Sequence, residues 1–137
     1  WNVNGRLISV KGVDDPHIDR DDYAGITNSF NEQADLTLGV VHAPYLRVLD
    51  AMAADNAQLI LAGHTHGGQV RVPGYGALVT NCDLDTARAS GLSQHQGSAL
   101  HVSAGLGCSR YAPFRFACPP EATLITLKPR SSHLEWS

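Results

Sequence analysis

Residues 36–62 of the chain read LTLGVVHAPYLRVLDAMAADNAQLILA, and this stretch decides the fold. Its two ends, 36–41 and 59–62, are short apolar runs of the kind that form buried strands. Between them, residues 45–56 repeat apolar side chains at the spacing of an amphipathic helix. We expect the buried face of this helix to carry Leu46, Leu49 and Ala53. A strand, a helix and a strand in succession are typical of a right-handed βαβ unit, so the stretch predicts an α/β fold.

The sequence on both sides of this unit predicts further elements. The additional strands that we expect are 5–13, 100–103 and 122–127. A short helix is expected at 23–30, with Asp21 or Asp22 capping its first turn.

The composition is that of one globular unit of 137 residues. Hydrophobic residues make up 43% and charged residues 17% of the chain, which argues against disorder. No apolar run approaches the ~20 residues that a membrane span needs. The net charge of −3 gives no electrostatic basis for nucleic-acid binding. The cysteines, Cys82, Cys108 and Cys118, are odd in number and show no CxxC spacing, so they do not predict a disulfide scaffold.

Histidines follow two of the expected strands. His42 comes directly after 36–41, and the run Gly-His-Thr-His-Gly-Gly at 63–68 follows 59–62. The carboxyl ends of parallel strands are where ligands bind in α/β sheets, and neutral imidazole is a common ligand of divalent transition metals. In extended backbone, the side chains of His64 and His66 would project to the same side. The pattern therefore predicts a metal site built from His42, His64 and His66.

These motifs carry a resemblance to a known family. AGHTHGGQ at 62–69 contains the GHxH motif of the calcineurin-like metallophosphoesterases, and His42 matches the single-histidine motif that precedes it. The chain is most similar to the membrane-associated bacterial subgroup, whose members act on lipid-linked phosphate or pyrophosphate compounds. The similarity includes Gly-Val-Asp-Asp-Pro at 12–16 and the run from 102 to 127. The resemblance implies a four-layer α/β/β/α sandwich, in which the strands up to residue 62 would belong mainly to one sheet and the C-terminal strands to a second sheet.

Two of the first three motifs of this family, DxH, GDxxD and GNH, do not occur in the chain. Only Asp15-Pro16-His17 formally satisfies DxH, and no GDxxD follows it. We expect Asp15 and His17 to end a strand and begin a helix rather than to bind metal. The resemblance thus implies that residues 1–137 are the C-terminal half of a phosphoesterase domain, and that the missing N-terminal half is its partner.

The resemblance also implies the chemistry. His42 and His64 would bind one divalent ion and His66 a second, either Mn, Fe, Zn or Co, with a bridging aspartate from the missing half. The general acid is expected in that half as well. Three neutral imidazoles carry no negative charge, so the chain alone is expected to bind at most one ion weakly and to be inactive. Candidate ligands of the substrate phosphate are Arg71, Arg110 and Arg115.

Other interpretations remain open at this point. The chain could be a self-contained, non-catalytic metal-binding module, or a structural domain whose histidines hold loops by hydrogen bonds. The module would use Asp15, His17, His42, His64 and His66, whereas His95, His101 and His133 show no pattern.

The substrate is expected to be a phosphate-containing small molecule or a lipid-linked compound. The location is expected to be cytoplasmic, or at the membrane through the missing N-terminal region. A half-domain also leaves strand edges and apolar faces uncovered, so we expect self-association. The apolar side chains that the expected helices cannot all cover are Ile8, Val40, Val41, Leu59, Ile60 and Leu61.

Overall fold

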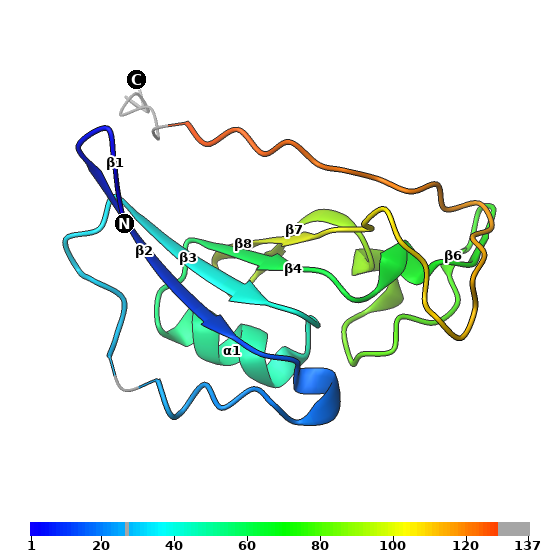
Figure 1. Cartoon of the computed structure of the whole chain (residues 1–137), viewed down its shortest axis with the longest axis horizontal. Helices are drawn as coiled ribbons and strands as arrows, with labels where there is room; N and C mark the ends of the chain where they lie inside the picture. Colours follow the sequence, from blue (N-terminus) through cyan, green and yellow to red (C-terminus); the bar gives the residue numbers. More distant parts are fainter. Residues whose placement is uncertain (27, 129–137) are drawn as a thin grey trace, which may run out of the picture.

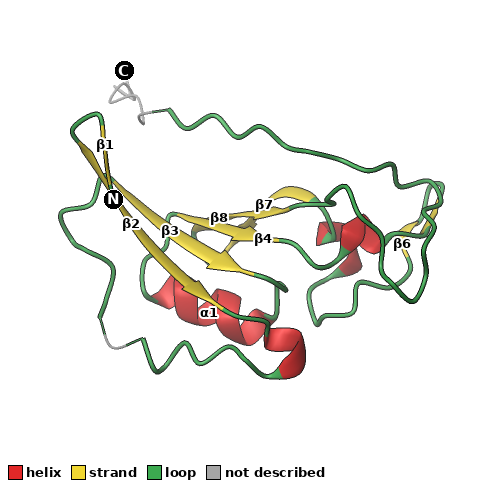
Figure 2. Ribbon diagram, in the orientation of Figure 1, coloured by secondary structure: helices red, strands yellow, loops and turns green. Residues whose placement is uncertain are grey.

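The computed structural model describes residues 1–26 and 28–128, which form a mixed α/β unit (Figure 1). A six-stranded sheet has the order β1-β2-β3-β4-β8-β7, and one helix, α1, lies against one of its faces (Figure 2). The sheet strands are β1 (Asn2–Val3), β2 (Arg6–Val13), β3 (Leu36–Val41), β4 (Leu59–Ala62), β7 (Gly91–His95) and β8 (Ser98–Val102). The helix is α1 (Leu46–Ala54), and a separate small hairpin is formed by β5 (Arg71–Val72) and β6 (Gly76–Ala77). Three short 3-10 helices are η1 (Pro16–Ile18), η2 (His66–Gly68) and η3 (Thr86–Arg88).

The register of the parallel strands brings their carboxyl ends to one level. β2, β3, β4 and β8 are mutually parallel, and β3, α1 and β4 form the expected βαβ unit. Val13 pairs with Val41, Val41 pairs with Ala62, and Ala62 pairs with Val102. The loops that leave these four strands therefore start side by side along one edge of the sheet.

Helix α1 packs closely on one face of the sheet. Its buried side chains are Val48, Leu49 and Met52, which join Val41, Ile60, Leu100 and Val102 in the core. A Cβ on Gly39 would lie 2.7 Å from Met52 Sδ, so glycine at this position lets the helix approach β3. The expected helical face was right at Leu49, which is fully buried, but Val48 and Met52 are buried beside it in place of Leu46 and Ala53. Leu46 is only partly buried at the rim of the core.

The opposite face of the sheet carries no helix among the described residues. Val10 and Val40 lie on this face, with 46% and 39% of their surfaces exposed. Leu92, on the edge strand β7, is 72% exposed. Apolar side chains on the central strands therefore meet solvent on this side.

Two expectations for the C-terminal part were wrong. β8 joins the first sheet beside β4, because Leu100 and Val102 belong to the core under α1. Residues 122–127 form no strand and run in an extended path back toward β1 (Figure 1). Strand propensity needs a partner edge to be realised, and in this segment Leu124 is 93% and Leu127 is 56% exposed.

The helix expected at 23–30 is absent from the described residues of that segment. The carboxylate of Asp22 accepts a hydrogen bond from Gly25 N at 2.8 Å, which closes a turn in place of a helix. Tyr23 donates to Asp55 at 2.9 Å and Phe30 is buried, so tertiary contacts fix this segment. A helix of eight residues has little stability of its own, and these contacts outweigh it.

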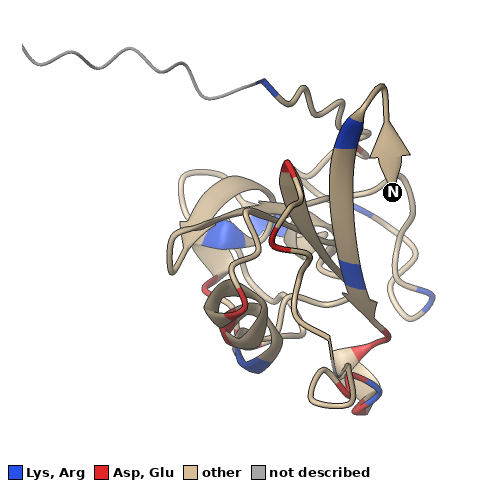
Figure 3. Cartoon of the chain, turned by 90° about the vertical axis from the view of Figure 1, so that its left-hand side faces the viewer, with Lys and Arg blue, Asp and Glu red and all other residues tan. Residues whose placement is uncertain are grey.

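Charged residues of both signs are mixed along the described chain, and both signs occur in the loop that follows β2 (Figure 3). Cys82, Cys108 and Cys118 are free thiols. In the described part of the chain, no helix has the length and apolar character needed to cross a membrane.

Candidate metal site at the carboxyl ends of the strands

Three side chains from three neighbouring strands meet at the edge of the sheet. Asp15 follows the end of β2, His42 the end of β3 and His64 the end of β4. One donor atom from each of them lies within 4.8 Å of the other two. His64 Nδ1 is 3.1 Å from His42 Nε2, and His42 Nε2 is 3.8 Å from Asp15 Oδ2. The level strand ends thus bring two imidazoles and a carboxylate together.

His64 is oriented by its second ring nitrogen. Nε2 lies 3.3 Å from the carbonyl oxygen of Asn81. Because a carbonyl only accepts, Nε2 carries the hydrogen in this contact, and Nδ1 faces His42 with its lone pair. Burial, and then the neighbouring His17 and His42, lower the pKa of His64, which favours the neutral ring. A neutral ring with a lone pair directed at the cluster is the form that binds metal.

His66 departs from the geometry that the sequence predicted. The backbone between the two histidines is not extended, because His64 and His66 both have positive φ, at 66° and 50°, and Thr65 is helical. His66 is not among the three residues whose donor atoms meet within 4.8 Å. Burial, and then Arg115, lower the pKa of its imidazole.

The glycines after His66 are required by close packing. Gly68 has a φ of +82°, and a Cβ there would overlap the Cβ of Ala77. A Cβ on Gly67 would lie 2.8 Å from Cys118 Sγ. The hydroxyl of buried Thr65 accepts from Gly67 N at 3.2 Å and donates to Ala89 O at 2.6 Å. The motif is therefore a tightly packed turn that only glycine accommodates.

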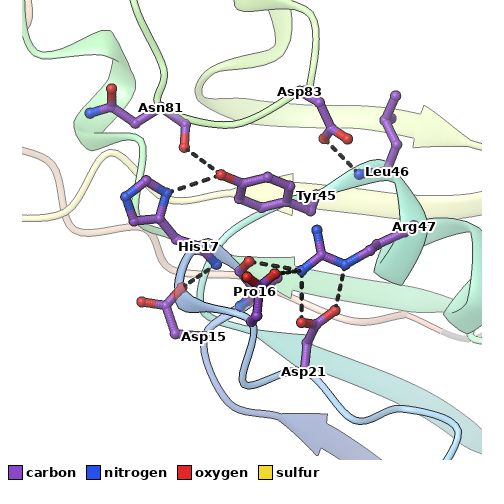
Figure 4. A network of polar contacts seen from close by, with 10 residues as sticks. Asp15, Pro16, His17, Asp21, Tyr45, Leu46, Arg47, Asn81 and Asp83 are labelled. Carbon is purple, nitrogen blue, oxygen red and sulfur yellow. Dashed lines mark hydrogen bonds and ion pairs between the residues drawn. The ribbon is translucent and has the colours of Figure 1, made fainter.

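Asp15 and His17 lie beside the histidine cluster, as in the alternative interpretation of the chain as a metal-binding module, and they also begin a helix. As expected, Asp15 begins a helix, because its Oδ1 accepts from His17 N at 2.9 Å and caps η1. The ring of His17 nevertheless lies against His64, with 4.6 Å between the ring centroids. His17 Nδ1 is 3.0 Å from the Tyr45 hydroxyl, which lies 3.3 Å from Asn81 O (Figure 4). This loop is thus part of the wall of the histidine cluster.

Helix α1 holds the same loop in place. Arg47 Nη2 donates to Pro16 O at 2.8 Å and to Asp21 Oδ1 at 2.7 Å, while Nε donates to Asp21 Oδ2 at 2.9 Å (Figure 4). The N-terminus of α1 is itself capped from afar, since Asp83 accepts from Leu46 N at 2.8 Å. Asp15 is therefore positioned by contacts to a rigid element.

The three candidate arginines occupy different settings. Arg115 directs its guanidinium at backbone carbonyls, among them those of His66 and Ala104 at 3.0 and 2.8 Å. Arg71 donates to Gly67 O at 3.1 Å. Arg110 is exposed and lies 5.7 Å from the centroid of the Tyr111 ring. The structure does not gather them into one phosphate-binding group.

A cavity of about 350 Å³ adjoins the histidines. His64 and His66 form part of its lining, together with Gln69, whose Oε1 accepts from Ser109 N at 2.7 Å. The apolar side chains in the lining include Val70, Leu78, Val79 and Tyr111. The remaining histidines lie elsewhere: His95 and His101 are buried, and His133 is outside the described residues.

Comparison with curated proteins found relatives of this chain. Over 126 residues the chain is 32% identical to the uncharacterized metallophosphoesterase YkuE of Bacillus subtilis. The sequence of the chain thus resembles that of a protein named as a metallophosphoesterase. The match to YkuE covers 92% of this chain and 42% of YkuE. The uncharacterized protein YpbG of the same organism is 29% identical over 127 residues, which is 93% of this chain and 44% of YpbG. The chain thus spans less than half the length of the curated relatives that it matches.

No protein-family model matches the chain, and no solved structure matches it.

Proposed function

We propose that the chain supplies the histidine-bearing half of a calcineurin-like metallophosphoesterase domain, and that the whole domain hydrolyses a phosphomonoester, phosphodiester or pyrophosphate. The observation that carries this proposal is the meeting of His42 and His64 at adjacent strand ends in a chain similar to YkuE. YkuE supports a hydrolase at the level of the family, and the substrate is part of the proposal. The four-layer sandwich and the N-terminal half of the domain are also parts of this proposal.

The donor set fits a divalent transition ion. Two ligands on a tetrahedral ion with bonds of about 2.0–2.1 Å lie about 3.3 Å apart. The separations of 3.1 Å between His64 and His42 and of 3.8 Å between His42 and Asp15 lie on either side of that value. Imidazole and carboxylate together suit Mn, Fe, Zn or Co. His42 and His64 would hold one ion, and His66 would contribute to the second. Such ions activate water and stabilise the charge that develops on a transferring phosphoryl group.

The residues of this chain would position the substrate beside the metals. The cavity at His64 and His66 offers an apolar wall, which includes Leu78 and Tyr111, for the part of the substrate that carries the phosphate. Arg110 is exposed beside Tyr111 and is the arginine best placed to contact an anionic group there. Arg71 and Arg115 would act close to the turn at 66–68, to which they already donate hydrogen bonds.

The proposal includes the class of substrate and the cellular location of the activity. The substrate would be a phosphate-containing small molecule or a lipid-linked compound. The site of action would be cytoplasmic or at the membrane surface, with any anchor supplied by the remainder of the protein.

The test is an assay of the complete gene product with a chromogenic phosphodiester and added Mn²⁺. We expect turnover by the complete protein and none by residues 1–137 alone, because the carboxylate motifs are absent from the chain. Turnover by residues 1–137 at the rate of the complete protein would contradict the half-domain proposal. A complete protein that binds metal but turns over neither phosphomonoesters, phosphodiesters nor pyrophosphates would favour a non-catalytic metal-binding module, for which the cluster of Asp15 with the histidines is the supporting observation.

A further inference from the structure

We propose that Asp15, His42 and His64 form a two-histidine, one-carboxylate site that binds one divalent transition metal ion within residues 1–137. The inference rests on the metal-ligand role proposed above for His42 and His64. It adds Asp15 as a ligand and makes the site complete in this chain, without any residue from the rest of the domain.

Each of the three donor residues is connected to the sheet by a very short segment of backbone. Val13, Val41 and Ala62 are paired across three parallel strands, and each proposed ligand follows its strand by one or two residues. The donors consequently start from one level of a rigid sheet. Their atoms lie within 4.8 Å of one another, a spread that a shared ion would draw together by small side-chain rotations.

The two carboxylate oxygens of Asp15 have different roles, one in capping the helix η1 and the other in the proposed metal site. Oδ1 accepts the hydrogen bond from His17 N that caps η1, at 2.9 Å. Oδ2 faces His42 Nε2. The side chain of Asp15 is 20% exposed and that of His42 is 52% exposed, so an ion can reach the donors from solvent. Asp15 supplies the negative charge that a site of imidazoles alone lacks.

A ring of hydrogen bonds supports the ligands from behind. Asn81 O receives contacts from the His64 ring at 3.3 Å and from the Tyr45 hydroxyl at 3.3 Å. The same hydroxyl is 3.0 Å from His17 Nδ1, and His17 N returns to Asp15 (Figure 4). Outer contacts of this kind orient metal ligands and raise affinity. The loop that bears Asp15 and the strand end that bears His64 are therefore fixed relative to each other.

The experiment is a titration of residues 1–137 with Co²⁺, followed by visible absorption, and with Zn²⁺, followed by calorimetry. We expect one ion per chain. Asp15→Asn should weaken binding at least about tenfold, because it removes a charged ligand, while asparagine still caps η1. Asp14→Asn is the matched control, since Asp14 is the exposed neighbour outside the cluster and carries the same charge. His42→Ala and His64→Ala should each reduce binding as well, and circular dichroism should show that all variants keep their fold.

The outcomes separate the two proposals. Binding that requires His42 and His64 but is the same in Asp15→Asn and Asp14→Asn would overturn the role of Asp15 and leave the metallophosphoesterase proposal intact. Absence of any bound ion on residues 1–137 would overturn the inference that the site is complete in this chain. Binding unaffected by His42→Ala and His64→Ala would overturn both.

Discussion

The carbonyl oxygen of His66 accepts a hydrogen bond from Arg115 Nη1 at 3.0 Å. The two residues lie far apart in the sequence, and the same guanidinium also binds the carbonyls of Ala104 and Gly105 at 2.8 and 3.0 Å. Arg115 thus ties the turn of the GHxH motif to the loop that leaves β8. A side chain with five donors in a planar fork can make such contacts, and lysine cannot.

We predict that Arg115→Lys lowers the free energy of unfolding by about 2 kcal/mol, because several charge-assisted hydrogen bonds to carbonyls are lost. Chemical denaturation of residues 1–137 measures this change. Arg110→Lys is the control and should leave stability unchanged, since Arg110 is exposed. Unchanged stability in Arg115→Lys, with a raised KM in the complete gene product, would instead assign Arg115 to substrate binding.

Gly68→Ala should destabilise the chain more than Gly74→Ala does. The two glycines have nearly equal φ, +82° and +80°, so both substitutions cost about 1–2 kcal/mol of backbone strain. Only at Gly68 would the added methyl group overlap a neighbour, the Cβ of Ala77, whereas nothing lies within 4 Å of the position at Gly74. We expect a further loss of about 1–3 kcal/mol at Gly68, measured by thermal or chemical unfolding. Equal losses would show that the turn relaxes freely.

The ion pair between Asp21 and Arg47 should make stability depend on pH in the acid range. Hydrogen bonding to Arg47 holds the pKa of Asp21 below its usual range. A lowered folded-state pKa contributes stability above the unfolded value of about 3.9, and this contribution is lost as the pH falls through the folded value. Asp21→Asn should therefore cost about 1 kcal/mol at pH 7, and the difference from the native chain should shrink below about pH 4.

The control for this experiment is Asp19→Asn. The side chain of Asp19 is 95% exposed and lies 3.3 Å from Arg47, so it should contribute less at every pH. If Asp21→Asn and Asp19→Asn had the same profile, the paired hydrogen bonds of Asp21 would have no special weight.

His64→Ala and His66→Ala in the complete gene product should each abolish phosphoesterase activity and leave the fold intact. Both residues lie beyond the end of β4, outside its hydrogen-bonded ladder, so neither is needed for strand pairing. Activity with a chromogenic phosphodiester and circular dichroism are the two measurements. Near-native rates in either variant would remove that residue from the site.

Residues 1–137 on their own should self-associate through the sheet face that carries Val40. Sedimentation velocity over a hundredfold range of concentration should show a rising average mass. Val40→Thr keeps a β-branched residue in the strand and removes apolar surface from both copies, so we expect the dissociation constant to rise about tenfold. Val72→Thr is the control, because Val72 is also exposed, at 42%, but lies in the small hairpin. A monomer of 14.6 kDa at all concentrations would contradict the prediction.

The βαβ unit could be predicted from the sequence because its signals are local. The apolar runs gave the bounds of β3 and β4 as they occur, and the histidines at their ends do meet. The helical face was predicted correctly at Leu49 only, since close packing against Gly39 favours Met52. The hairpin of β7 and β8 has a sequence signal in the dipeptide Gln96-Gly97, since glycine favours such turns. In the structure both residues have positive φ, as in a two-residue hairpin turn.

The place of Asp15 beside His42 does not follow from a local signal, although the metal-binding module interpretation had grouped the two residues. It depends on the pairing of Val13 with Val41, a relation between strands that no local pattern encodes. The carbonyl contacts of Arg115 are equally invisible, because an arginine that binds backbone has the same sequence setting as one that binds phosphate. Residues 122–127 show the converse, since their alternation is strand-like but no described strand pairs with them.

The pairing of β4 with β8 has a consequence for synthesis on the ribosome. β2, β3 and β4 leave the exit tunnel in that order and can align as soon as they emerge, whereas β8 follows only after residues 63–97 have been made. Domains fold while the chain grows, and an unpaired strand edge recruits other chains. Between the emergence of β4 and that of β8, the nascent protein therefore presents the open edge of its most apolar strand, and this interval is when a chaperone would protect it.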